Sequence, residues 1–113
     1  MEDFKLCILE TPYAGDVTEN VEYAQKCMHD MLLRKEAPYA SHLLYTQPNV
    51  LDDLIPEERE LGIYAGFAWK HLQGVHTVFY IDRGMSGGMK LAEEYCKTNN
   101  MSVEYRTLYS EEK

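Results

Sequence analysis

The order of strand-like and helix-like segments is the feature that most constrains how this chain can fold. Runs rich in apolar, β-branched or aromatic residues predict four strands, at residues 4–9, 37–45, 75–81 and 102–108. Amphipathic stretches with start and stop signals predict three helices between them, at residues 16–35, 56–73 and 86–98. Such alternation is typical of a parallel sheet with helices on both faces and right-handed crossovers. We therefore expect one α/β domain over residues 1–113.

The second predicted helix contains the single tryptophan of the chain. Pro56 suits the first turn of this helix, and Gly74 ends it. Its apolar stripe, which we expect to face the core, consists of Leu61, Tyr64, Ala65, Ala68, Trp69 and Leu72.

The net charge of −8 narrows the classes of partner. Binding of DNA or RNA requires a basic stripe, and the sequence has none, so we expect no polymeric nucleic acid as partner. No window of about 18 uncharged apolar residues predicts a membrane span, so we expect no membrane contact. The acidic start of the chain lacks the basic region of a signal peptide, so we expect a cytoplasmic protein.

Cysteine and histidine spacing predicts neither a disulfide framework nor a metal site. Cys7, Cys27 and Cys96 are odd in number and form no C-x-x-C pair, which favours free, buried thiols. No H-x-x-x-H motif or mixed His/Cys spacing is present. We expect no metal and no cofactor.

The loops after the first and third predicted strands are the candidate binding segments. Ligands of parallel sheets bind beyond the carboxyl ends of the strands, near the point where the strand order reverses. We expect these two strands side by side in the centre of the sheet. The sequences that follow them, "ETPYAGD" and "DRGMSGG", should then meet.

The first of these loops offers Pro12, Tyr13, Gly15 and Asp16 as ligand-binding residues. Pro12 fixes the backbone, and Gly15 permits a left-handed conformation. Asp16 caps the next helix, with Glu19 at capping-box spacing. Tyr13 is then placed to stack on a base or sugar. The alternative is an ordinary turn with a tyrosine on its surface.

The second loop combines small residues with a helix start, as phosphate cradles do. It lacks the G-x-G-x-x-G pattern and the P-loop lysine. The alternative is a mobile loop with a capping serine. Its candidates are Asp82 for a ribose hydroxyl and, for the cradle, Gly84, Ser86, Gly87, Gly88 and Met89.

Four further residues are weaker candidates. Ser41 and His42 lie near the end of the second predicted strand, where a lone histidine is more often structural than catalytic. Glu60 and Glu93 lie on predicted helices and could point into the site, although solvated acids are the commoner case.

Five segments resemble small proteins of phages and bacteria that are similar to the nucleoside 2-deoxyribosyltransferase-like superfamily. The segments are "TPYAGDVTENVEYAQ", "APYASHLL", "EERELGIYAGFAW", "YIDRGMSGGM" and "VEYR". The resemblance implies a three-layer α/β/α, flavodoxin- or Rossmann-like sandwich with a four- to five-stranded parallel sheet. It also implies a homo-oligomer, with a small nucleotide or nucleoside bound over the first and third strands.

In the enzymes of that superfamily, a glutamate near the start of the third helix attacks the anomeric carbon. Counting along the related S-x-G-x-x-x-E pattern from Ser86 places Ala92 at the position of this glutamate. Glu93 is one residue later, which is a rotation of roughly 100° on a helix. The binding loops are retained, but the nucleophile is out of register.

Three functions follow as hypotheses. The first is binding of a small nucleotide or nucleoside derivative without efficient catalysis, with sequestration of a nucleotide signal by a phage protein as one use. The second is an N-glycosidase or deoxyribosyltransferase that uses Glu93 or Glu60. The third is an acidic phage protein that inhibits a host defence protein by direct binding.

Overall fold

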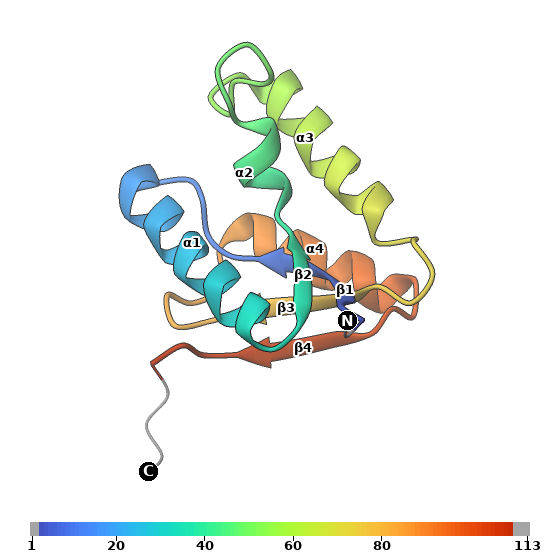
Figure 1. Cartoon of the computed structure of the whole chain (residues 1–113). Helices are drawn as coiled ribbons and strands as arrows, with labels where there is room; N and C mark the ends of the chain where they lie inside the picture. Colours follow the sequence, from blue (N-terminus) through green and yellow to red (C-terminus); the bar gives the residue numbers. More distant parts are fainter. Residues whose placement is uncertain (1–2, 110–113) are drawn as a thin grey trace.

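The fold is a four-stranded, all-parallel sheet with helices on both faces (Figure 1). The structure is a computed structural model and describes residues 3–109. The strands are β1 (Lys5–Glu10), β2 (Glu36–Tyr39), β3 (His76–Tyr80) and β4 (Val103–Arg106). Their order is β2-β1-β3-β4, so the predicted α/β class and the central pairing of the first and third strands are confirmed.

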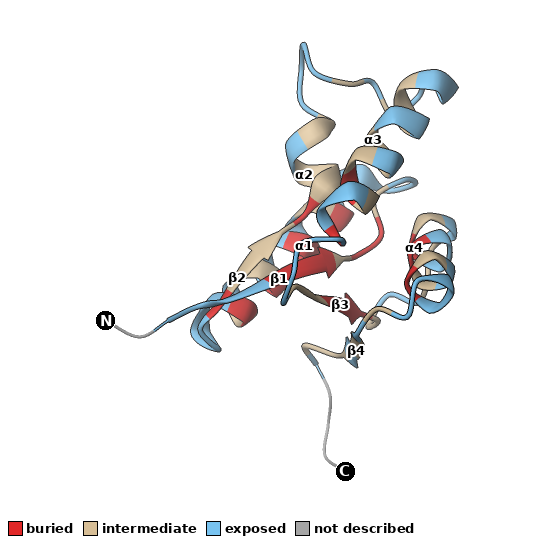
Figure 2. Cartoon of the chain, turned by 90° about the vertical axis from the view of Figure 1, so that its right-hand side faces the viewer, coloured by how far each residue is buried: buried red, intermediate tan, exposed pale blue. Residues whose placement is uncertain are grey.

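Helices α1 (Val17–Leu33) and α4 (Gly87–Thr98) cover opposite faces of the sheet (Figure 1). Helices α2 (Ser41–Tyr45) and α3 (Pro56–Trp69) project beyond the β2 edge of the sheet, which is the edge opposite β4, as both ribbon views show (Figures 1 and 2). Among residues 3–109, no helix is long and apolar enough to cross a membrane.

The core is formed where the two central strands lie between α1 and α4, as Figure 2 shows. On the α1 side, Leu9 and Val78 pack with Tyr23 and Met31. On the α4 side, Phe79 packs with a smaller cluster that includes Met89 and Ala92. Strands buried on both faces in this way have near-continuous apolar sequences.

The three thiols belong to this interior. Cys7, Cys27 and Cys96 are free and at most 1% exposed, as the sequence predicts. Burial raises the pKa of the Cys7 thiol to about 11 and that of Cys27 to about 12. All three therefore remain protonated and unreactive in the folded protein.

A polar network on the sheet links β4 to β2. Arg106, with only 7% of its side chain exposed, donates to the Glu36 carboxylate at 2.6 and 2.8 Å. It also donates to Glu104 at 2.7 Å and to the Tyr80 hydroxyl at 3.1 Å. The Tyr80 hydroxyl in turn donates to Asp30 of α1 at 2.6 Å. The hydrogen bonds from Arg106 lower the pKa of Glu104 to about 2.

The predicted strand over residues 37–45 is wrong beyond Tyr39. The N–H groups of Leu43 and Leu44 donate to the Ala40 carbonyl at 3.1 and 3.2 Å, which closes a helical turn. The chain therefore enters α2 at Ser41. Periodicity alone does not distinguish a short helix from a strand in so short an apolar run.

The predicted core stripe of α3 is also wrong. Leu61 and Tyr64 are 62% and 60% exposed, and Trp69 and Leu72 are each 46% exposed. The helix turns its opposite side inward, where Gly66 lies against Ser41 of α2. Because a Cβ on Gly66 would lie 2.7 Å from Ser41 Oγ, the missing side chain is what permits this approach.

Candidate functional site

A cavity of about 130 Å³ lies at the carboxyl ends of the central strands. Glu10 ends β1 directly opposite Phe79 of β3, so the loops after both strands begin at the same edge of the sheet. The cavity is lined by Glu10, Thr11, Tyr13, Ala14, Ser41, His42, Asp53, Arg59, Ile63, Gly66, Phe67, Ser86, Gly87, Gly88 and Met89. Tyr13 and Ser86, which are far apart in the chain, therefore share one cavity.

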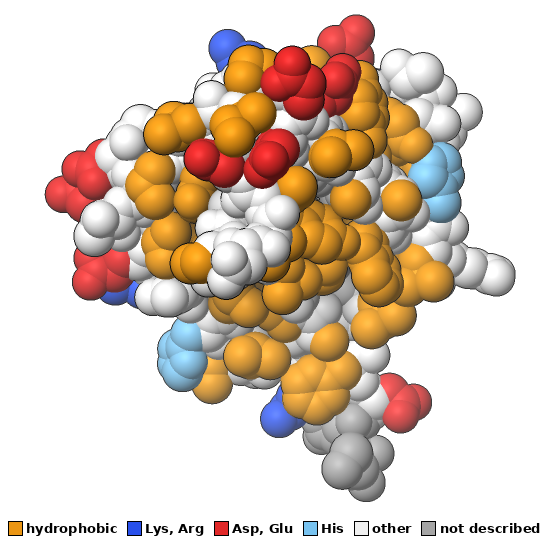
Figure 3. Space-filling view, turned by 90° about the horizontal axis from the view of Figure 1, so that it is seen from above, with side chains coloured by type: hydrophobic (Ala, Val, Ile, Leu, Met, Phe, Trp, Pro, Cys, Tyr) orange, Lys and Arg blue, Asp and Glu red, His pale blue; other side chains and the backbone are white. Residues whose placement is uncertain are grey.

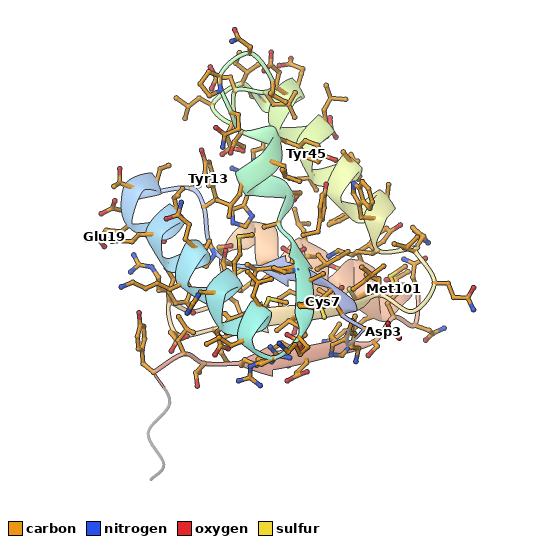
Figure 4. All side chains as sticks on the ribbon, viewed as in Figure 1. Asp3, Cys7, Tyr13, Glu19, Tyr45 and Met101 are labelled. Carbon is orange, nitrogen blue, oxygen red and sulfur yellow. The ribbon has the colours of Figure 1, made fainter. Side chains whose placement is uncertain are left out.

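The loop after β1 is held in place by a buried asparagine. Asn20 of α1 donates from Nδ2 to the carbonyls of Tyr13 and Ala14, each at 3.1 Å. Arg83 donates to Asn20 Oδ1 at 2.9 Å. The Tyr13 ring lies 5.7 Å from that of His42 between their centroids, and Figure 4 shows Tyr13 between α1 and α2. The aromatic side of the cavity is thus fixed by α1.

His42 supplies a neutral ring to the cavity wall. Its Nε2 lies 2.9 Å from Thr11 Oγ1, within hydrogen-bond distance. Burial lowers the pKa of His42 to about 4. At neutral pH the ring is uncharged and contributes one hydrogen-bond donor and one acceptor.

Charged groups reach the cavity from β1 and α3. The Lys70 ammonium lies 2.6 Å from Glu10 Oε2, and its side chain is only 1% exposed. Arg59 lies 3.5 Å from Asp53 across a more exposed contact. Because this second pair is long and partly exposed, the guanidinium can exchange Asp53 for an anionic ligand at little cost.

The start of α4 forms the remaining wall. Ser86 is the N-cap, and its Oγ accepts from the Met89 N–H at 3.2 Å. A Cβ built on Gly87 or Gly88 would meet no atom within 4 Å. Packing within the protein therefore does not require glycine at either position, and there is open space beside the first backbone N–H groups of the helix.

A wider groove of about 720 Å³ adjoins the cavity. Tyr13, Ala14 and Asp53 line both spaces. The rest of the groove is lined by Gly15 and Val17 at the start of α1, by the loop over residues 46–54 and by Glu58 of α3. A ligand larger than the inner cavity can extend into it past Tyr13.

The structure brings together seven of the twelve predicted ligand-binding residues. These are Tyr13, Ser41, His42, Ser86, Gly87, Gly88 and Met89. The remaining five, which do not line the cavity, are Pro12, Gly15, Asp16, Asp82 and Gly84. Pro12 is buried, Asp16 caps α1 by accepting from the Glu19 N–H, and Gly15 and Gly84 have positive φ values of 97° and 83°.

Asp82 is engaged elsewhere. Its carboxylate accepts from the Tyr23 hydroxyl at 2.5 Å and from the backbone N–H groups of Leu108 and Tyr109 at 2.8 and 3.0 Å. Burial acts to raise the pKa of Asp82, but these hydrogen bonds outweigh it and hold the pKa below its usual value. The residue ties the segment after β4 to α1.

The two glutamates predicted as nucleophiles also lie outside the cavity lining. Glu93 accepts a hydrogen bond from the Tyr105 hydroxyl of β4, and Glu60 is exposed on α3. Ala92, at the position of the superfamily glutamate, is buried against Phe79 and Met89.

Sequence reasoning missed the charged residues of the cavity. Glu10 is the last residue of β1, Asp53 lies in the loop before α3, and Arg59 lies on the same side of α3 as Ile63 and Gly66. Lys70, the residue after α3, does not line the cavity but pairs with Glu10. The signal was present, because positions 59, 63, 66 and 70 have helical spacing.

Comparison with known proteins places this α/β chain in a family. A domain of unknown function (DUF7768) matches residues 5–106, and the chain belongs to that family. The match runs from the first residue of β1 to the last residue of β4, so it covers the whole sheet. No curated protein and no solved structure matched the chain. Among the described residues 3–109, no cluster of three or more His, Cys, Asp or Glu could hold a metal ion.

Proposed function

We propose that this protein binds a small nucleotide or nucleoside derivative in the cavity at the carboxyl ends of β1 and β3, without efficient catalysis. The observation that carries the proposal is that Tyr13, Arg59 and the open start of α4 line one cavity. These supply an aromatic face, a cation and backbone donors, which are the groups that recognise a base and a phosphate.

The two spaces differ in the part of the ligand they suit. The inner cavity, at about 130 Å³, is matched to a phosphate or ribose rather than to a whole nucleotide. A phosphate there would accept from the N–H groups of Gly87 and Gly88 and from Arg59, because the N–H groups of Ser86 and Met89 already donate within the helix cap. The base would then lie beside Tyr13 in the adjoining groove. Ser41 and Asp53 are the polar groups available to sugar hydroxyls.

The cavity lacks the two glutamates expected to act as nucleophiles. A glycosyl nucleophile has to reach the anomeric carbon, and neither Glu93 nor Glu60 lines this cavity. The carboxylates that do line it, Glu10 and Asp53, are paired with Lys70 and Arg59. A use in keeping with binding alone is the sequestration of a nucleotide signal.

The test is calorimetric titration with mononucleotides, cyclic nucleotides and ADP-ribose-type compounds. We expect at least one to bind with a Kd below ~1 mM. Gly88→Asp should abolish this binding, because its carboxylate would stand where the phosphate is held. The helix should tolerate the change, since an acid in the first turn is favourable and the site has open space.

Thr18→Asp is the matched control, because Thr18 is the second residue of α1 as Gly88 is of α4, and it lines neither the cavity nor the groove. This variant should bind normally. Absence of heat with every compound, or equal loss of binding in both variants, would count against the proposal. Release of free base from deoxynucleosides or NAD would favour the enzyme instead.

A further inference from the structure

The outward side of α3 is an apolar surface that none of the described residues 3–109 covers. Leu61, Tyr64 and Ala68 follow Glu57 at spacings of four, three and four residues, and all four are exposed. This spacing places them along one side of the helix, opposite Gly66, which lies against α2. Figure 3 shows hydrophobic side chains gathered over the surface formed by α2 and α3.

The two ends of this surface differ in shape. Leu54, just before α3, is 90% exposed and forms a projection. Beyond the last turn of α3, a shallow depression is lined by Ala68, Trp69, His71 and Leu72. The projection and the depression lie at opposite ends of the same helix.

We propose that two copies of this chain pair through α3, antiparallel and related by a two-fold axis that passes between Leu61 and Tyr64. A two-fold axis at that point places Leu61 of one copy on Tyr64 of the other. It brings Glu57 beside Ala68 of the second copy, close to His71. It also inserts Leu54 into the depression at the far end of the second helix.

The apolar area is sufficient for such a pair. Leu54, Ile55, Leu61, Tyr64, Trp69 and Leu72 are 41–90% exposed. Together they expose on the order of 700 Å² per copy, against the ~800 Å² that each partner contributes to a standard interface. Ala68, the last of the four residues spaced along the outward side of α3, has a small side chain that lets a facing helix approach closely.

The helix dipoles favour the antiparallel arrangement. Antiparallel helices oppose their dipoles favourably. Acidic side chains lie beside the apolar surface in Figure 3, and the net charge of −8 repels an anionic lipid surface and a second copy alike, so the apolar contacts have to provide the pairing energy.

The first test is mass by light scattering after size exclusion. At ~100 µM, above the micromolar Kd of the weaker interfaces of this size, we expect about twice the 13.1 kDa of the chain. Leu61→Glu should give the monomer mass with an unchanged circular dichroism spectrum. Leu91→Glu is the matched control, because Leu91 is an exposed leucine on α4, and it should remain paired.

The second test does not depend on how Leu61→Glu folds. Leu61→Cys and Tyr64→Cys chains, mixed and oxidised, should form a cross-linked pair, whereas Leu33→Cys on the exposed end of α1 should not. The native thiols are buried and do not interfere. A monomer at ~100 µM, pairing that survives Leu61→Glu, or failure of the 61–64 cross-link would overturn the proposal. None of these outcomes depends on whether a nucleotide binds.

Discussion

At the scale of single residues, His42 shows how the fold sets the chemistry of the cavity. The ring of His42, the second residue of α2, lies 5.7 Å from that of Tyr13, and its Nε2 lies 2.9 Å from Thr11 Oγ1. Because burial penalises the imidazolium, the pKa is lowered to about 4. The ring is therefore neutral at any pH near 7, with Nε2 already within hydrogen-bond distance of Thr11 Oγ1.

The lowered pKa of His42 predicts that stability falls in mild acid. The histidine pKa is about 6.5 in an unfolded chain, so the unfolded state takes up more protons than the folded state between about pH 6.5 and 4. Stability is present in full above this window and is lost as the pH falls through it, by about 1 kcal/mol per pH unit. Urea unfolding at pH 7, 6 and 5 measures the slope.

His42→Gln is the comparison for this experiment, because it keeps a polar group near Thr11 without a titrating ring. The variant should retain only the shallower slope that the carboxylates contribute. Equal slopes in the two proteins would mean that His42 is protonated in the folded state at no cost.

At the scale of elements, the packing of α3 on α2 depends on one glycine. A Cβ on Gly66 would lie 2.7 Å from Ser41 Oγ and 2.9 Å from Ser41 Cβ. Gly62, one turn earlier, would place a Cβ 3.2 Å from Leu51 Cδ1, which is the end of a flexible side chain. Both glycines lie on α3, but only Gly66 is in a position where the packing leaves no room for a side chain.

Alanine at these two glycines should therefore have opposite effects. Gly66→Ala should reduce the free energy of unfolding by about 1–2 kcal/mol, because overpacking outweighs the better helix propensity of alanine. It should also weaken ligand binding, since Gly66 and Ser41 both line the cavity. Gly62→Ala should be neutral or stabilising by up to about 1 kcal/mol. Thermal unfolding of both variants measures the two effects. A similar loss of stability in each variant would contradict the packing argument.

The elements also show which parts of the structure sequence could predict. The sequence predicts β1 and β3 because each is a short, near-continuous run of apolar and β-branched residues, and it predicts α4 because Ser86 marks a helix start. The inward side of α3 was missed because apolar residues lie on both of its sides, with Ile63 and Phe67 inward and Leu61 and Tyr64 outward. Local periodicity cannot choose between two such sides.

Long-range contacts explain the remaining errors in the site. Asp82 has the sequence position of a ribose-binding acid, but its partners Tyr23 and Leu108 come from distant parts of the chain. Lys70 is likewise assigned to the site only through its contact with Glu10 of β1.

At the scale of the whole molecule, the Arg106 network joins the two edges of the sheet. Arg106 of β4 and Glu36 of β2 form a nearly buried pair, whereas Arg34, the residue after α1, is about half exposed where it pairs with Asp30 one turn earlier. Removing one partner of a buried pair leaves an uncompensated charge, and removing one partner of an exposed pair does not.

Arg106→Met should therefore lower the free energy of unfolding by about 3 kcal/mol or more, because Glu36 and Glu104 lose their cation. Arg34→Met should change it by less than about 0.5 kcal/mol. Urea denaturation of the two variants makes the comparison. Comparable small losses would mean that water replaces the guanidinium at the buried site.

The burial of the three thiols has a practical consequence for studying this chain. A maleimide can modify one of these cysteines only while the interior around it is open. The rate of modification therefore measures how often that part of the interior opens. Cys7 and Cys27 belong to the α1 side of the sheet, and Cys96 belongs to α4. The chain thus has a native thiol probe on each side of its sheet. Peptide mapping after brief exposure to maleimide would show whether the two sides open together or separately.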